Sequence, residues 1–199
     1  MTDPDDTEPP AADHRVIGIA LAIVAIAALG FALVTQRWLL SPGGGTGFGL
    51  RETFTCGQDA CVTRPNAEAV LDFASSIVRD DREHAAAIFP ALGWVTSILI
   101  AIGMLGLGIA AVAAAARKRP HWPIAPTTIA LLPVMIALVT GFVFLATKPG
   151  DATFVGVAIG FWVFGVGEIC AVIASLLLTR AIRPPDPDLT ADAMNPDEF

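Results

Sequence analysis

Four long apolar runs constrain this 199-residue chain more than any other feature of its sequence. A transmembrane α-helix needs about 20 consecutive, mostly apolar residues, and each run is close to or above that length. The composition agrees, because 16% of the residues are charged, against about 25% in a typical soluble domain. We therefore predict an all-α membrane protein with a bundle of four transmembrane helices, at residues 16–34, 91–116, 124–146 and 152–178.

The segments outside these runs are short or polar. Residues 1–15 and 179–199 are acidic and rich in proline, so we expect them to form disordered tails. Residues 117–123 and 147–151 are predicted to be turns between spans, and residues 35–90 form a long loop. The first run follows an acidic leader and is too long for the core of a signal peptide, so we expect it to remain as a helix.

Basic residues near the ends of the spans predict the orientation in the membrane. Arg15, residues 117–119 and Arg180 lie at one set of span ends, whereas Arg37 and Lys148 lie at the other. The more basic side is expected to face the cytoplasm. We therefore predict a multi-pass protein of the plasma or inner membrane with both termini in the cytoplasm. The long loop and the turn between the third and fourth spans then face outward.

Two of the three cysteines, Cys56 and Cys61, lie in the long loop with four residues between them. They could clip a metal, form a redox centre or staple the loop. In an oxidising compartment such a pair forms a disulfide. A structural zinc site needs four ligands, and besides carboxylates the loop adds only His84. We therefore predict a disulfide, with no metal and no cofactor.

The long loop divides into two predicted elements. Residues 48–64 are rich in strand-forming residues on either side of the "GQDA" that separates the cysteines, which predicts an extracytoplasmic hairpin with the disulfide across it. Residues 66–84 carry apolar side chains at intervals of three and four, which predicts a helix that begins at Asn66 and docks onto the hairpin. Pro90 is expected to mark the bend into the second span.

The order of these features resembles the claudins and the related peripheral-myelin-type four-helix proteins. Trp38 follows the first span, then come Gly49 and Leu50, the cysteine pair and a later arginine, Arg79 or Arg82. The resemblance implies a left-handed four-helix bundle beneath a small extracellular sheet. It also implies an activity in adhesion, barrier formation or regulation of a membrane partner, without chemistry. The residues given structural roles by the resemblance are Trp38, Gly49, Leu50, Cys56 and Cys61.

Small residues within the spans predict where helices approach one another, because close packing in lipid requires small side chains. Gly156 and Gly160 form a GxxxG pair in the fourth span, and Gly93, Ser97 and Gly106 lie in the second. We expect these residues to pack the bundle internally. The alternative is an interface with another subunit.

Glu168 is an ionisable residue well inside the fourth span, where a charge is costly and often marks function. Pro133, in the third span, lacks an N–H and leaves the carbonyl of Ile129 without its helical partner. We expect a protonated Glu168 at the same depth to donate a hydrogen bond to that carbonyl. The alternative is a proton or cation site in a small transporter or channel.

The sequence contains no HExxH, P-loop or GxSxG motif of the common hydrolases and nucleotide-binding proteins, and an acidic chain without a basic stripe argues against nucleic acid. We predict a non-catalytic integral membrane structural or interaction protein, such as an accessory subunit or an adhesion or barrier protein. Its expected partners are the lipid bilayer and either another membrane protein or a second copy. The alternatives are a membrane thiol–disulfide oxidoreductase that uses Cys56 and Cys61, or a transporter that uses Glu168.

Overall fold

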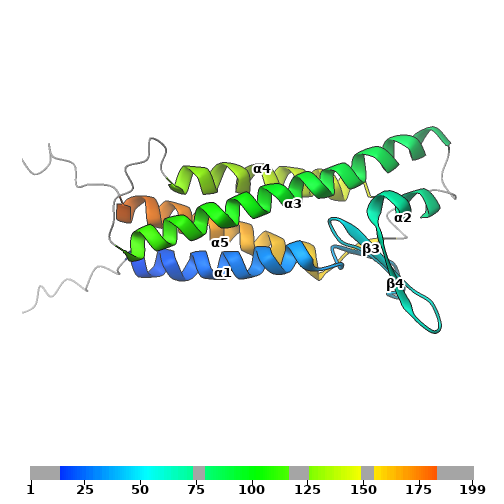
Figure 1. Ribbon diagram of the computed structural model, residues 1–199, viewed down its shortest axis with the longest axis horizontal. Helices are drawn as coiled ribbons and strands as arrows, with labels where there is room; N and C mark the ends of the chain where they lie inside the picture. The colour runs from blue at the N-terminus through cyan, green and yellow to red at the C-terminus, as the bar shows by residue number, and fades with distance from the viewer. Residues whose placement is uncertain (1–13, 74–78, 117–125, 149–154, 183–199) are drawn as a thin grey trace, which may run out of the picture.

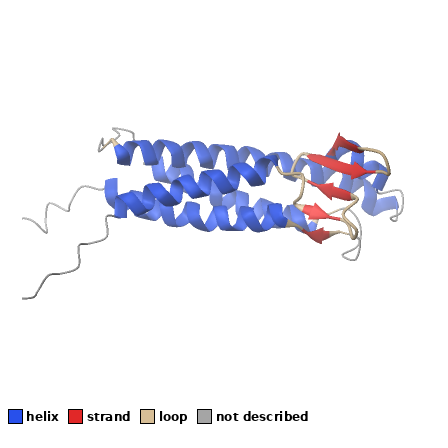
Figure 2. Cartoon of the chain, turned by 90° about the horizontal axis from the view of Figure 1, so that it is seen from below, coloured by secondary structure: helices blue, strands red, loops and turns tan. Residues whose placement is uncertain are grey.

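A computed structural model describes residues 14–73, 79–116, 126–148 and 155–182 of the chain. Four long helices run side by side, and a small sheet lies with helix α2 at one end of them (Figures 1 and 2). Each of the four helices contains a stretch long and apolar enough to cross a membrane, which confirms the predicted four-helix membrane class. They are α1 (His14–Val34), α3 (Arg79–Ala115), α4 (Pro126–Ala146) and α5 (Ile159–Ile182).

The second long helix starts earlier than we predicted. Helix α3 begins at Arg79 and continues through Pro90, so Pro90 does not separate the second span from the residues before it. Proline removes only one N–H from the helical ladder, and helices of membrane proteins tolerate such a gap where neighbouring groups compensate. The helix predicted over residues 66–84 is present as α2 (Asn66–Phe73); residues 74–78 lie outside the described residues, and Arg79 already belongs to α3. As Figure 1 shows, α3 projects beyond the other helices toward α2.

The fourth long helix starts later than we predicted. Gly156 and Val157 form strand β5 (Gly156–Val157), and α5 begins only at Ile159. The assignment of Gly156 to a helical GxxxG pair is therefore wrong. The 24 residues of α5 can cross a bilayer without the preceding segment, which leaves that segment available for the sheet.

The sheet has five strands in the order β4-β3-β2-β1-β5, and every neighbouring pair is antiparallel. Its first four strands are β1 (Leu39–Leu40), β2 (Thr46–Phe48), β3 (Glu52–Cys56) and β4 (Cys61–Pro65). The predicted hairpin is present as β3 and β4, which pair Cys56 with Cys61. The sheet is larger than that hairpin because β1 pairs on one side with β2 and on the other with β5, from the far end of the chain.

The turn between β1 and β2 needs glycine. Gly43 and Gly44 have φ angles of 88° and 75°, in the left-handed region where a side chain is strained. The turn is closed by Ser41, whose backbone N–H donates to the Thr46 carbonyl at 2.8 Å and whose Oγ accepts from the Thr46 N–H at 3.0 Å. The "SPGGGTG" stretch therefore folds as a tight reversal rather than as a loose linker.

Small side chains fill much of the bundle interior. The fully buried alanines are Ala22, Ala25, Ala32, Ala110, Ala130, Ala137, Ala171 and Ala174. Helix α1 packs mainly on α5, and α3 packs mainly on α4. Where glycine replaces alanine the helices come closer still: a Cβ at Gly106 would lie 2.8 Å from the Cα of Ala130 on α4. Close approach of this kind lets helices associate in lipid.

Candidate functional site: the sheet and the buried carboxyl

Trp38 joins the sheet to the bundle. It lies between α1 and β1, is fully buried, and donates a hydrogen bond from Nε1 to the Ala32 carbonyl at 2.6 Å. Its ring lies 4.9 Å from that of Phe164 on α5 and 5.9 Å, edge-on, from that of Phe144 on α4, measured between centroids. Aromatic pairs at these distances add to the free energy of burial. These contacts give Trp38 a structural role.

Further aromatic rings extend the contact between the sheet and the bundle. Phe89 of α3 stacks on Phe144 of α4 with 4.2 Å between centroids, and Phe48 of β2 meets Phe89 edge-on at 5.9 Å. On the other side, Gly160 has no room for a side chain, because a Cβ there would lie 2.9 Å from the Trp38 ring. Helices α3, α4 and α5 therefore all contact the sheet through one continuous set of rings.

The turn between β2 and β3 is fixed by a buried asparagine. The side-chain amide of Asn66 donates to the carbonyls of Gly49 and Leu50 at 3.0 and 3.1 Å, and its Oδ1 accepts from the Thr53 hydroxyl at 2.7 Å. Below this turn, a Cβ at Gly93 would overlap the Leu50 carbonyl oxygen. Gly93 thus serves the contact between α3 and the sheet, in addition to helix packing against Phe144. The sequence around Asn66 does not indicate its hydrogen bonds to the turn, and the sequence around Gly93 does not indicate its contact with Leu50.

The hairpin carries the disulfide that we predicted. Cys56 and Cys61 are bonded, and the Gly57 N–H donates to the Ala60 carbonyl at 2.9 Å to close the tip. A bonded pair offers no thiolates to a zinc ion. Among the described residues, no group of three or more histidine, cysteine, aspartate or glutamate side chains could hold a metal.

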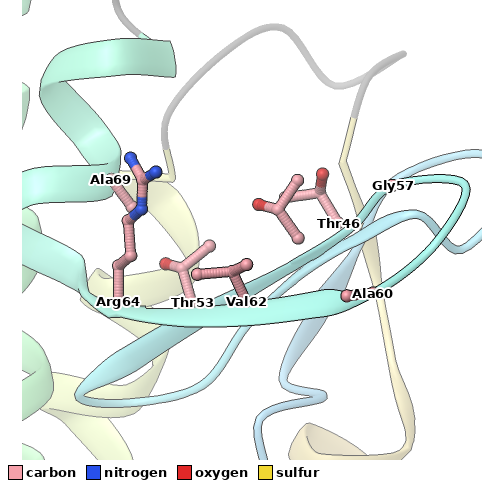
Figure 3. Close-up of a pocket in the computed structure, with 8 residues that line it drawn as sticks. Thr46, Thr53, Gly57, Ala60, Val62, Arg64 and Ala69 are labelled. Carbon is pink, nitrogen blue, oxygen red and sulfur yellow. The ribbon is translucent and has the colours of Figure 1, made fainter.

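The two faces of the hairpin differ. One face, with helix α2 at its side, encloses a cavity of about 440 Å³. Figure 3 shows Thr53, Val62 and Arg64 projecting into it from the strands, with Ala69 of α2 alongside. Strand β4 is exposed along its whole length and forms one edge of the sheet. The hairpin therefore presents an accessible surface on the side where α2 lies.

Glu168 is the second candidate site. Its side chain is 2% exposed, and both carboxyl oxygens lack a hydrogen-bond partner among the described residues. The predicted bond to the Ile129 carbonyl is therefore absent. The reason is the vertical offset between antiparallel α4 and α5: Gly141 lies against Phe164, so Glu168 is level with Ala137. Pro133 is one turn, or about 6 Å, further along the axis.

Several other polar groups inside the bundle have hydrogen-bond partners. The Thr96 hydroxyl of α3 donates to Thr140 of α4 at 2.9 Å, and Thr140 donates to the Ala137 carbonyl at 3.1 Å. Ser97 donates to the Gly93 carbonyl of its own helix at 2.8 Å, so its hydroxyl makes no bond between helices. The hydroxyl of Ser175, two turns beyond Glu168 on α5, has no partner among the described residues. Glu168 and Ser175 are seven residues apart and therefore lie on the same face of α5. Neither side chain has a hydrogen-bond partner among the described residues.

Neither a scan against protein-family models nor a search of curated proteins finds a match, so similarity assigns no family to the chain. What the chain can do follows from two geometric features. One is a sheet mounted rigidly on a membrane bundle, and the other is a carboxyl buried inside that bundle.

Proposed function

We propose that the chain is an integral membrane structural or interaction protein, without catalytic activity, whose sheet contacts a partner on the outer side of the membrane. The observation that carries this proposal is the rigid joint between sheet and bundle. Trp38 is buried between α1, α4 and α5, with its Nε1 bonded to Ala32. A surface held in place before binding loses less conformational freedom when a partner docks.

The exposed hairpin is the part of the sheet best suited to contact a partner. Strand β4 is an accessible edge, and unpaired edges are common sites of strand addition. Its Val62 side chain is exposed although it is apolar. The partner is another membrane protein or a second copy, consistent with an accessory, adhesion or barrier role.

Two arguments support an outward orientation. A disulfide persists in an oxidising compartment, and the Cys56–Cys61 bond lies in the sheet. The basic residues near span ends favour the opposite end of the bundle for the cytoplasm. A sheet stapled by a disulfide above four helices is also what the resemblance to the claudins implies, and it supports a role in contact between proteins.

The test is site-directed photocross-linking of the full chain in intact membranes. A photoreactive residue at Val62 should give a protein adduct of defined mass, either with another membrane protein or with a second copy. The same residue at Thr179, near the far end of α5, is the matched control and should not give that adduct. Adducts with lipid alone from Val62 would contradict the proposal.

A second candidate function is proton-coupled transport through Glu168. Its support is the buried carboxyl without a partner, because such groups inside membranes often lie on proton pathways. Purified chain in liposomes would then conduct protons, and Glu168→Gln would abolish the flux while leaving the fold intact. Equal flux in the wild type and Glu168→Gln would exclude this candidate. Ser175→Ala tests whether the second unsatisfied group belongs to the same path.

A further inference from the structure

A second cleft lies on the face of the hairpin opposite the cavity in Figure 3. Its volume is about 370 Å³. The end of α1 and the segment after it form one wall, with Val34, Thr35 and Arg37; the hairpin forms the other, with Phe54, Thr63 and the disulfide. Because side chains alternate along a strand, these hairpin residues face away from the cavity lined by Thr53, Val62 and Arg64. The hairpin thus overhangs the end of α1.

This cleft lies at the level where a membrane changes from hydrocarbon to headgroups. The apolar span of α1 ends at Val34, whose side chain is 69% exposed. The backbone carbonyl of Arg37 accepts from the Gly160 N–H at 2.8 Å, and Trp162, two residues further on α5, is 64% exposed. Tryptophan is enriched in the headgroup layer. The mouth of the cleft therefore opens where phosphates of the bilayer are found.

The polar end of the cleft matches a phosphate. Arg37 is exposed, and its guanidinium presents donors in a planar fork that fits phosphate oxygens. The hydroxyls of Thr35 and Thr63 add two further donors to the lining, which includes no carboxylate among the described residues. Glu52, just outside the cleft, accepts a hydrogen bond from the Gln36 amide at 3.1 Å.

The apolar end of the cleft continues along the helix. Val24, Phe31 and Val34 are all exposed on α1, and their spacing of seven and three residues places them on one face of the helix. This stripe runs from the cleft toward the middle of the span. A ligand with a phosphate at one end and a hydrocarbon chain at the other would satisfy both parts.

We propose that the cleft binds a glycerophospholipid, with the headgroup phosphate on Arg37 and an acyl chain along Val34, Phe31 and Val24. The site requires only that the bundle lies in a membrane, so it is independent of the contact proposed for the outer face of the hairpin. It assigns the overhanging hairpin a second role, as one wall of a lipid site.

The test is native mass spectrometry of the full chain, delipidated in mild detergent and titrated with palmitoyl-oleoyl-phosphatidylglycerol. Arg37→Gln should weaken binding about tenfold, as expected for the loss of a hydrogen bond to a charged group. Arg64→Gln, which changes the same charge on the opposite face of the hairpin, should leave binding unchanged. Equal binding by the wild type and Arg37→Gln, or equal weakening in both variants, would overturn the proposal.

A second pair of variants leaves the charge unchanged. Thr63→Trp should fill the cleft and reduce lipid binding, whereas Thr55→Trp, on the other face of the same hairpin, should not. Inorganic phosphate in large molar excess should fail to displace the lipid, because it has no acyl chain. Displacement by phosphate would contradict the acyl-chain contact, and unchanged binding in Thr63→Trp would contradict the location of the site.

Discussion

Trp38 illustrates how one side chain can hold two parts of this molecule together. Its indole spans the boundary between α1 and the sheet, and it contacts rings from two further helices. A buried tryptophan combines a large apolar area with an N–H that needs a partner, and the Ala32 carbonyl supplies that partner. Removal of the ring should therefore affect the sheet and the bundle at once.

We predict that Trp38→Ala lowers the free energy of unfolding by about 3–5 kcal/mol, the usual cost of truncating a buried aromatic residue. Trp38→Phe keeps an aromatic ring but loses the hydrogen bond to Ala32. Loss of that bond should account for about 1 kcal/mol of the decrease in the free energy of unfolding. Reversible unfolding in mixed micelles, followed by circular dichroism, measures both values. A smaller loss in Trp38→Ala than in Trp38→Phe would refute the role of the ring contacts.

Glu168 differs from Trp38 because its polar atoms have no partner among the described residues. Glu168→Leu replaces the carboxyl with an apolar side chain of similar size. Loss of an unsatisfied buried polar group should raise the free energy of unfolding by about 1–3 kcal/mol. The same unfolding experiment tests this, with Ser175→Ala as a smaller change on the same face. Destabilisation by Glu168→Leu would mean that the carboxyl has a structural bond, for example to a water molecule.

Helices α3 and α4 approach closely because a glycine of α3 lies at the point of contact with α4. A glycine of α3 that lies away from this contact does not contribute to the approach. A Cβ at Gly106 would meet the backbone of Ala130 at 2.8 Å, whereas a Cβ at Gly108 would have no atom within 4 Å. Both glycines lie in α3, two residues apart, which places them on different faces of the helix.

Gly106→Ala should therefore destabilise the bundle by about 1–3 kcal/mol, because the helices must move apart. Gly108→Ala is the matched control and should be neutral or stabilising by up to about 1 kcal/mol, since alanine favours the helix. Thermal unfolding in one detergent compares the two variants. Equal effects would show that α3 and α4 are not held at this contact.

The helices could be predicted from the sequence, whereas most of the sheet could not. Long apolar runs identify the spans, and strand-forming residues on either side of "GQDA" identify β3 and β4. Strands β1 and β5 have two residues each and pair across the chain, so no local periodicity marks them. The GxxxG spacing of Gly156 and Gly160 does not indicate where a helix begins, and here α5 begins between the two glycines, at Ile159. The vertical offset that separates Glu168 from Pro133 depends on packing between helices, which the sequence of either helix does not specify.

At the scale of the whole molecule, the sheet lies at one end of the four long helices. The other ends of these helices lie together, at the end of the bundle far from the sheet (Figure 1). The sheet thus lies at one end of the bundle, and the start of α1 and the end of α5 lie at the other. If the sheet faces outward, as we propose, the two ends should differ in their access to a reagent that cannot cross the membrane.

We predict that Pro42→Cys, in the exposed turn between β1 and β2, reacts with a membrane-impermeant maleimide in intact cells. Ala181→Cys, exposed near the far end of α5, should react only after the cells are permeabilised. Both substitutions belong in a Cys170→Ala background, with the native disulfide left oxidised. The reverse pattern of labelling would invert the proposed orientation.

Strand β5 lies directly before α5, and its partner β1 lies directly after α1. During synthesis β1 is made early, yet the strand that pairs with its second edge is made only after three of the four long helices. The five-stranded sheet therefore cannot be completed until residues 156–157, which follow three of the four long helices, have been made. A nascent chain stalled before β5 would therefore leave the second edge of β1 unpaired.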